Sequence, residues 1–402
     1  LLLFLILIFI TPLPQHWLNA SSFLSGTVFF LSILFFTNTI LFGFKINIKS
    51  FKIITGIFLF FICHLFLLQF ILREGDFSRG FFSIVLLILM LFGAYIFSND
   101  IFYFSNNQFN KIINFIVIMF YIVFICKYIP QIQNNAIHIK PIMPFNEPSH
   151  FVVFFLPFYY FKFFTASTQK EKYLILIIGL IIGILSNNLT MIVGVFLGAL
   201  IGFRSYIFLI ALILFLIFPF ISNYIDLGYF TSRLNIDKNT DNLSVLVIIQ
   251  GWQLAYEGFI KSFGLGIGMQ QLGFVELHTE AGYIIEKVTS KEGVNVTDAG
   301  ITAPKIICEF GFFGIIAILV YIFYFIKFTI NIKKTNSAVL IFAYSIYISF
   351  AIQLFIRGIG YFNAPFFLFL TSIFIILKNK ILKFNKDEVL DELHEFEKKI
   401  NF

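Results

Sequence analysis

Long uninterrupted apolar runs constrain this chain more than any other feature. A run of about 20 apolar residues has the length of a helix that crosses the hydrocarbon core of a bilayer. In all, 59% of the residues are hydrophobic and 12% charged, whereas soluble domains average about 45–50% and about 25%. By length we expect about twelve spans, at Leu1–Leu13, Phe23–Phe44, Ile53–Leu72, Gly80–Phe97, Ile112–Ile129, Phe151–Phe164, Tyr173–Leu185, Met191–Phe203, Ile207–Ile221, Ile306–Phe325, Val339–Ile356 and Ala364–Leu377. Because a helix satisfies its own backbone groups in lipid, the sequence predicts an all-α polytopic membrane protein.

One long polar connection divides the predicted spans. We expect transmembrane helices 1–9 within residues 1–221, a large extracytoplasmic loop over 222–304, transmembrane helices 10–12 within 305–377, and a cytoplasmic amphipathic tail over 378–402. Inside the loop, Val245–Lys261 has the periodicity of an amphipathic helix, and the glycines of Gly264–Gly268 are expected to end it. We interpret the first run as a truncated span and not as a cleavable signal peptide, since it lacks a flanking basic region and cleavage site.

Charge and cysteine placement narrow the function classes. Threading twelve spans puts most lysines of short loops on one side, which places both termini in the cytoplasm. The net charge of +7 follows from these lysines, so a nucleic-acid partner is not expected. Cys63, Cys126 and Cys308 lie in or beside apolar runs, where neither a disulfide framework nor a metal site is expected.

The arginines oppose the trend of the lysines. Four of the five fall on the predicted outer side, namely Arg73, Arg79, Arg233 and Arg357. A guanidinium group binds phosphate oxygens through two parallel hydrogen bonds and stays charged, which suits a pyrophosphate or an acidic sugar. The alternative is that these arginines snorkel at helix ends and pair locally, Arg73 with Glu74 or Arg79 with Asp76.

Arg357 is harder to explain locally, because it sits in an apolar turn with no acid nearby in sequence. A charge at that depth requires a partner. Glu309, Glu147 or a ligand phosphate could supply it, and the sequence does not decide among them.

A short motif precedes the sixth predicted span: Asn146-Glu147-Pro148-Ser149-His150-Phe151. Asn146 or Glu147 would cap the helix, Pro148 suits its first turn, and a carboxylate gains from the positive end of the helix dipole. The same turn presents the carboxylate of Glu147 and the imidazole of His150 at the membrane edge, as general-base activation of a sugar hydroxyl would need.

Together these features resemble Wzy-type O-antigen polymerases. The resemblance lies in the Asn-Glu-Pro-Ser-His-Phe motif, the loop around Arg233, the segment from Trp252 to Gly268, and Glu309-Phe310-Gly311-Phe312-Phe313-Gly314. It implies a metal-independent glycosyltransferase of the bacterial inner membrane that joins undecaprenyl-pyrophosphate-linked repeat units at the periplasmic face. A chain-length regulator protein is a further possible partner, and no cofactor is expected.

Residue roles follow as expectations. Glu147, His150 and His278 are the candidate catalytic residues, and Arg233, Arg357, Arg79 and Arg73 the candidate pyrophosphate ligands. O-antigen ligases are similar in architecture, but the loop here has His278-Thr279-Glu280 in place of the expected His-Asn pair. A flippase or other transporter would need ionisable groups inside the bundle, which are scarce. No Asp-x-Asp pair, Walker loop or Rossmann fingerprint is present in the sequence, so nucleotide-dependent chemistry is not predicted.

Overall fold

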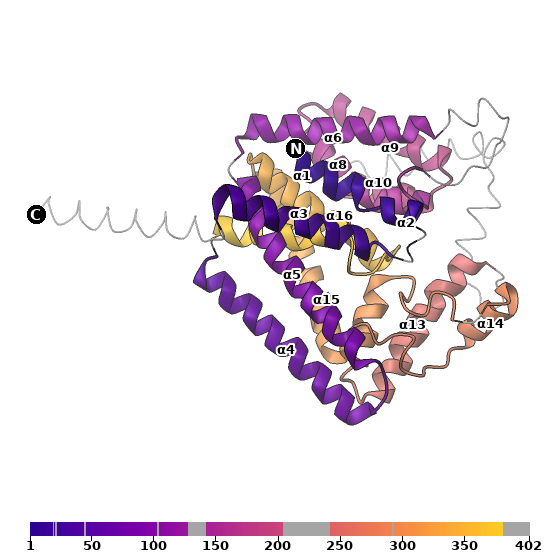
Figure 1. Ribbon diagram of the computed structural model, residues 1–402. Coiled ribbons are helices and arrows are strands. Elements are labelled where there is room, and N and C mark those ends of the chain that lie inside the picture. Colours follow the sequence, from indigo (N-terminus) through magenta and orange to yellow (C-terminus); the bar gives the residue numbers. More distant parts are fainter. Residues whose placement is uncertain are drawn as a thin grey trace, which may run out of the picture.

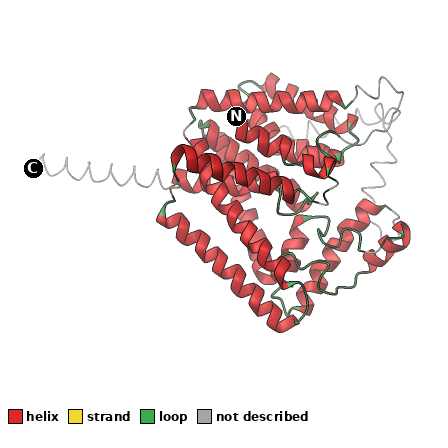
Figure 2. Cartoon of the chain, viewed as in Figure 1, coloured by secondary structure: helices red, strands yellow, loops and turns green. Residues whose placement is uncertain are grey.

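The computed structural model describes residues 1–18, 20, 22–43, 46–102, 104–127, 142–203, 242–291 and 293–380. These residues form helices joined by turns, with isolated bridges only at Ile142–Phe145 and Leu272–Val275 (Figure 2). The helices are α1 (Leu2–Leu5), the π-helix η1 (Ile6–Ile10), α2 (Leu13–Trp17), α3 (Leu24–Phe42), α4 (Ile48–Leu72), α5 (Phe77–Phe102), α6 (Asn106–Cys126), α8 (Pro148–Thr165), α9 (Gln169–Leu185), α10 (Leu189–Gly202), α13 (Leu243–Lys261), α14 (Glu280–Thr289), α15 (Thr302–Asn331), the 3₁₀ helix η2 (Ile332–Lys334), α16 (Ala338–Phe355), and a further helix over 364–380.

The prediction of an all-helical membrane protein is confirmed. Within the described residues, seven helical segments are long and apolar enough to cross a bilayer: α3, α4, α5, α6, α13, α15 with η2, and α16. Six of them coincide with predicted spans. The seventh, α13, was expected to be a surface helix of the large loop.

Twelve spans and a single large loop are therefore not confirmed. The first predicted run is divided among α1, η1 and α2. The runs after Tyr173 and Met191 form two separate helices, α9 and α10, as expected, but both are short. The predicted span Ile207–Ile221 and most of the predicted tail lie outside the described residues.

The centre of the bundle is the pair α8 and α16. Nearly all of α16 is buried, and so is the apolar part of α8. Phe342, near the start of α16, packs on Phe158 and Phe161, near the end of α8. The two helices consequently run antiparallel, which brings the N-terminus of α8 to the C-terminus of α16.

A second group of helices lies below this centre in Figure 1. There α4 and α5 form a hairpin, α13 lies beside the first half of α15, and α14 packs on α13. The inner face of α13 packs on α15, with the thiol of Cys308 donating a hydrogen bond to the carbonyl of Leu254 at 3.1 Å.

The glycine-rich segment after α13 completes a kink in α15. Gly311 has non-helical dihedrals (φ 54°, ψ −126°), so the ladder of α15 is interrupted there. The backbone N–H groups of Ile267 and Gly268 donate to the carbonyls of Cys308 and Glu309, both at 2.9 Å. A Cβ atom at Gly311 would collide with the backbone of the glycine-rich segment, which explains the glycine there.

Candidate functional site

The structure joins two of the predicted site residues directly. A guanidinium nitrogen of Arg357 donates to a carboxylate oxygen of Glu147 at 2.6 Å, across 210 positions of sequence. Glu147 is the N-cap residue of α8, and Arg357 lies just beyond the C-terminus of α16. The contact follows from the antiparallel packing of these helices, and each charge faces the helix end whose dipole favours it. Of the two carboxylates considered for Arg357, the structure selects Glu147.

Glu147 holds the N-cap position without capping the helix through its side chain. Its carboxylate instead accepts hydrogen bonds from Arg357 and from the hydroxyl of Ser149 at 2.9 Å. Burial acts to raise the pKa of Glu147, but the positive charge of Arg357, together with His150 and the hydrogen bonds, outweighs it and holds the pKa below its usual value. The carboxylate is therefore ionised at neutral pH.

His150 lies one turn along α8 from Glu147. Its Nε2 is 4.0 Å from a carboxylate oxygen of Glu147, and its ring packs edge-on against Phe23 with centroids 5.1 Å apart. The Nδ1 atom is buried and has no hydrogen-bond partner. Glu147, His150 and Arg357 thus form one cluster, here called the outer cluster.

A second polar group, which the sequence did not predict as a unit, lies at the start of α15. The fully buried ammonium of Lys305 donates to the carbonyl of Thr297 at 2.7 Å and to a carboxylate oxygen of Asp298 at 3.3 Å. It is also 3.9 Å from a carboxylate oxygen of Glu309, likewise fully buried. The available signal was a Lys and a Glu at i and i+4 inside an apolar run, because ionisable residues in such runs are seldom incidental.

The turn after α16 connects the two groups. The backbone N–H of Gly358 donates to the carbonyl of Gly300 at 3.0 Å, and Gly358 packs on the backbone of Ile301 and Thr302. Asp298 is also close enough to act electrostatically on His150. The loop before α15 therefore borders the outer cluster.

Buried polar atoms without hydrogen-bond partners gather in this region. In the described part of the chain they include Nδ1 of His150, Oγ1 of Thr302 and Nε of Arg357. Native proteins seldom leave such atoms unsatisfied, so their accumulation indicates a place where water or a polar ligand binds. No other part of the described chain gathers as many.

Arg73 and Arg79 lie elsewhere, around the connection between α4 and α5. Arg73 ends α4 in a left-handed conformation (φ 53°), and the guanidinium of Arg79 stacks on Phe274 at 4.5 Å from the ring centroid. The expected local pairs do not appear among the ion pairs of the described residues. Glu74 pairs with Lys261 at 2.6 Å, and Asp76 accepts from the backbone N–H of Arg79 at 3.0 Å.

The last of the described candidates, His278, does not join the cluster either. His278 is 87% exposed and lies 3.1 Å from a carboxylate oxygen of Glu276. It lines a groove on α13, and no described contact links it to Glu147. Arg233 lies outside the described residues.

Comparison with known proteins does not assign the chain to a family. No protein-family model, curated protein or solved structure matches it. Function is therefore argued from the residues and the geometry of the outer cluster.

Proposed function

We propose that the protein is an extracytoplasmic polymerase of lipid-linked oligosaccharides, with its reaction centre at the outer cluster. The single observation that carries the proposal is the Glu147–Arg357 pair, set at two helix ends beside two buried nitrogens without hydrogen-bond partners, Nδ1 of His150 and Nε of Arg357. The motif resemblance supplies the substrate class, undecaprenyl-pyrophosphate-linked repeat units, and the localisation in the bacterial inner membrane.

The outer cluster has groups suited to this transfer. Arg357 is about a third exposed, at 32%, so part of its guanidinium remains accessible while one nitrogen holds Glu147. A guanidinium binds the oxygens of a pyrophosphate and stabilises the charge that develops when the pyrophosphate leaves. Glu147 is half-exposed and ionised, so it can accept a proton from, or orient, a sugar hydroxyl.

The proposed step is a nucleophilic displacement at an anomeric carbon. A hydroxyl of the acceptor repeat unit attacks this carbon in the lipid-linked donor chain and forms the new glycosidic bond. The bond from the anomeric carbon to the pyrophosphate oxygen breaks, and undecaprenyl pyrophosphate leaves with the electron pair. The hydroxyl proton passes to Glu147. Holding two lipids in register supplies much of the rate enhancement.

The glycan pattern of a strain that lacks the gene tests the proposal. A lipid core capped with a single repeat unit would support a polymerase, because one unit would still be flipped and ligated. An uncapped core would contradict it and would favour the ligase or the flippase. Complementation with Arg357→Lys should shorten the polymer at equal protein level, because lysine keeps the positive charge but cannot form the two parallel hydrogen bonds of a guanidinium.

Orientation is tested separately by cysteine labelling in a background without native cysteines. A membrane-impermeant reagent should label Lys291→Cys, in the segment before α15, on intact spheroplasts. It should label Asn336→Cys, between η2 and α16, only after permeabilisation. The opposite pattern would place the outer cluster on the cytoplasmic side and remove it from periplasmic chemistry.

A further inference from the structure

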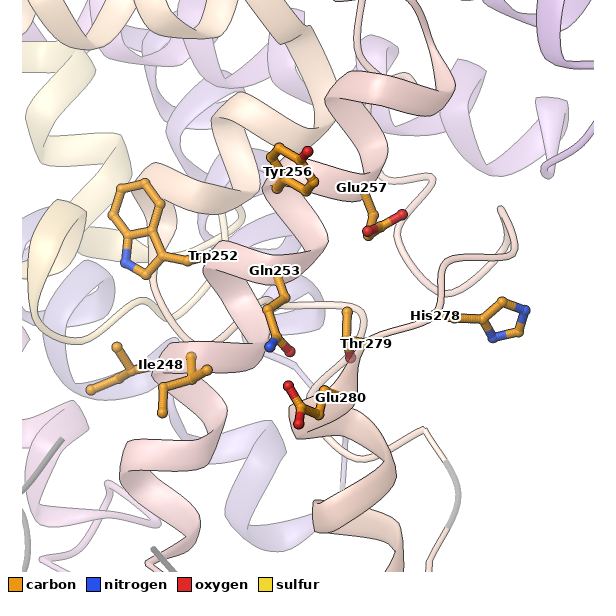
Figure 3. Close-up of a pocket in the computed structure, with 9 residues that line it drawn as sticks. Ile248, Trp252, Gln253, Tyr256, Glu257, His278, Thr279 and Glu280 are labelled. Carbon is orange, nitrogen blue, oxygen red and sulfur yellow. The ribbon is translucent and has the colours of Figure 1, made fainter. Parts of the chain in front are cut away.

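The outer face of α13 carries a groove with no role in the step just described. Its volume is about 650 Å³, within the range of small-molecule sites, about 300–1,000 Å³. Figure 3 shows it between α13 and the segment that leads into α14. It is lined by Ile248, Ile249, Trp252, Gln253, Tyr256, Glu257, His278, Thr279 and Glu280.

Two large aromatic rings stand on this face. Trp252 and Tyr256 are one helical turn apart and are 46% and 65% exposed. The opposite face of α13, with Leu254 and Ala255, is buried in the core. The rings are therefore not needed to pack α13. Exposed aromatic rings one turn apart can stack on the apolar C–H faces of successive pyranose rings.

Hydrogen-bonding groups border the rings. Gln253 and Glu257 occupy the adjacent positions of α13, one turn apart, and Glu280 faces them from the start of α14 (Figure 3). The carboxamide oxygen of Gln253 accepts from the backbone N–H of Ala281 at 2.9 Å, which fixes that side chain. Thr279 caps α14 by accepting from the N–H of Gly282 at 3.1 Å. The side chains of Gln253 and Thr279 are thus held in place before any ligand arrives.

The charges of the groove select among sugars. Glu257 and Glu280 line it, Glu276 lies beside His278, and neither Lys nor Arg is among the lining residues. Carboxylates accept hydrogen bonds from sugar hydroxyls and repel uronic acids and phosphates. The groove therefore suits a neutral sugar or an amino sugar and excludes the pyrophosphate end of a lipid-linked substrate.

Its position relates it to the outer cluster. On the inner side of α13, Gly251 packs on the carbonyl of Ala299, and the neighbouring carbonyl of Gly300 accepts from Gly358, next to Arg357. The groove and the turn that carries Arg357 thus lie on opposite sides of α13. A helix with its side chains is about 10–12 Å across, a distance that an oligosaccharide of a few sugars can span.

We propose that this groove binds neutral or amino sugars of the oligosaccharide, at a distance from the reducing-end pyrophosphate. The assignment of the ligand to the protein's own substrate rests on the proposed polymerase function. The saccharide-binding property itself does not, and it is measured independently below.

The two tryptophans of the chain make a direct measurement possible. Trp17→Phe leaves Trp252 as the one tryptophan, so its fluorescence reports the groove in full-length protein in lipid nanodiscs. The probes are neutral oligosaccharides from partial acid hydrolysis of the surface polysaccharide of the encoding bacterium, with a uronic-acid trisaccharide for comparison. We expect saturable changes with the neutral sugars and none with the acidic one.

Variants in the same background locate the binding. Tyr256→Ala should weaken binding about tenfold through loss of a stacking ring, whereas Tyr256→Phe should retain most of it. Tyr283→Ala is the matched control, since Tyr283 is 71% exposed on α14 but does not line the groove. If Tyr256→Ala and Tyr283→Ala lose sugar affinity equally, the assignment of binding to this groove is wrong.

A parallel measurement distinguishes sugar from membrane. Nanodiscs with brominated acyl chains should leave Trp252 fluorescence unquenched. Strong quenching together with no response to millimolar neutral sugar would show that this face of α13 contacts lipid and would overturn the proposal. If the protein binds sugar but the deletion strain has an uncapped core, the groove proposal stands and the polymerase proposal is wrong. If the deletion strain has a core capped with a single unit but the protein binds no sugar, the polymerase proposal stands and the groove proposal is wrong.

Discussion

The ion pair between Glu147 and Arg357 can be tested by a double-mutant cycle with Glu147→Gln, Arg357→Gln and the double variant. Two unit charges 4 Å apart attract by about 4 kcal/mol at an effective dielectric constant of 20. Fully exposed pairs contribute only about 0.2–1 kcal/mol, and removing one partner of a buried pair costs about 3–5 kcal/mol. Since the two side chains are 50% and 32% exposed, we expect an intermediate coupling energy of about 1–2 kcal/mol.

The free energy of unfolding in mixed micelles measures this coupling. Each single variant should be less stable than the wild type, and the double variant should lose less than the sum of the two. A coupling energy below about 0.3 kcal/mol, within the error of additivity, would refute the inference that the pair holds the ends of α8 and α16 together.

The charge-swapped variant, Glu147→Arg with Arg357→Glu, separates structure from chemistry. It restores an ion pair but places each charge at the unfavourable helix end, which costs about 0.3–1 kcal/mol per charge. Stability should therefore recover in part. Polymer from the swapped variant would restrict Glu147 and Arg357 to a structural role, whereas a folded variant without polymer would support their contact with substrate.

Three further predictions concern stability. Gly251→Ala should destabilise the protein by about 1–3 kcal/mol, because its Cβ would meet the carbonyl of Ala299. Gly56→Ala should instead stabilise it by about 0.5–1 kcal/mol, because a Cβ at this exposed position within α4 meets no other atom. Thermal unfolding compares the two variants. Lys305→Met should lower the free energy of unfolding by about 3–5 kcal/mol, because it leaves Glu309 buried without its cation. Adding Glu309→Gln should recover most of that lost stability in the same measurement. Because the folded pKa of Glu147 is lowered, its contribution to stability should be present above the unfolded pKa and lost as pH falls through the folded pKa. The stabilities of wild type and Glu147→Gln should therefore converge only on acidification below the usual glutamate pKa of about 4.3.

Part of the outer cluster could be predicted from the residue types alone. The motif around Glu147 predicted the start of a helix and a carboxylate at its end, and both are present. The isolation of Arg357 in an apolar turn predicted a partner for its charge. The identity of that partner required the antiparallel packing of α8 and α16, since residues 210 positions apart meet only after the helices associate.

Three further candidates lie apart from the outer cluster. Arg73, Arg79 and His278 have the residue types and the predicted side of the membrane that substrate binding would need, yet the structure sets them around α13 and the α4–α5 connection. Lys305 was passed over because a single lysine at the start of an apolar run ordinarily marks topology. The structure distinguishes it by its burial, which is a property of the assembled bundle.

Composition and the lengths of the apolar runs by themselves determined that this protein is helical and lies in a membrane, because those properties follow from the transfer of side chains and backbone groups into lipid one segment at a time. Local residue preferences likewise set helix ends. Pro148 stands in the first turn of α8, Asn242 caps the start of α13, and the glycines from Gly264 follow its end. The tertiary structure decided which helix ends meet and that the glycine-rich segment completes the kink of α15. Those outcomes depend on packing between segments distant in sequence, and the periodicity of a single segment carries no information about its neighbours.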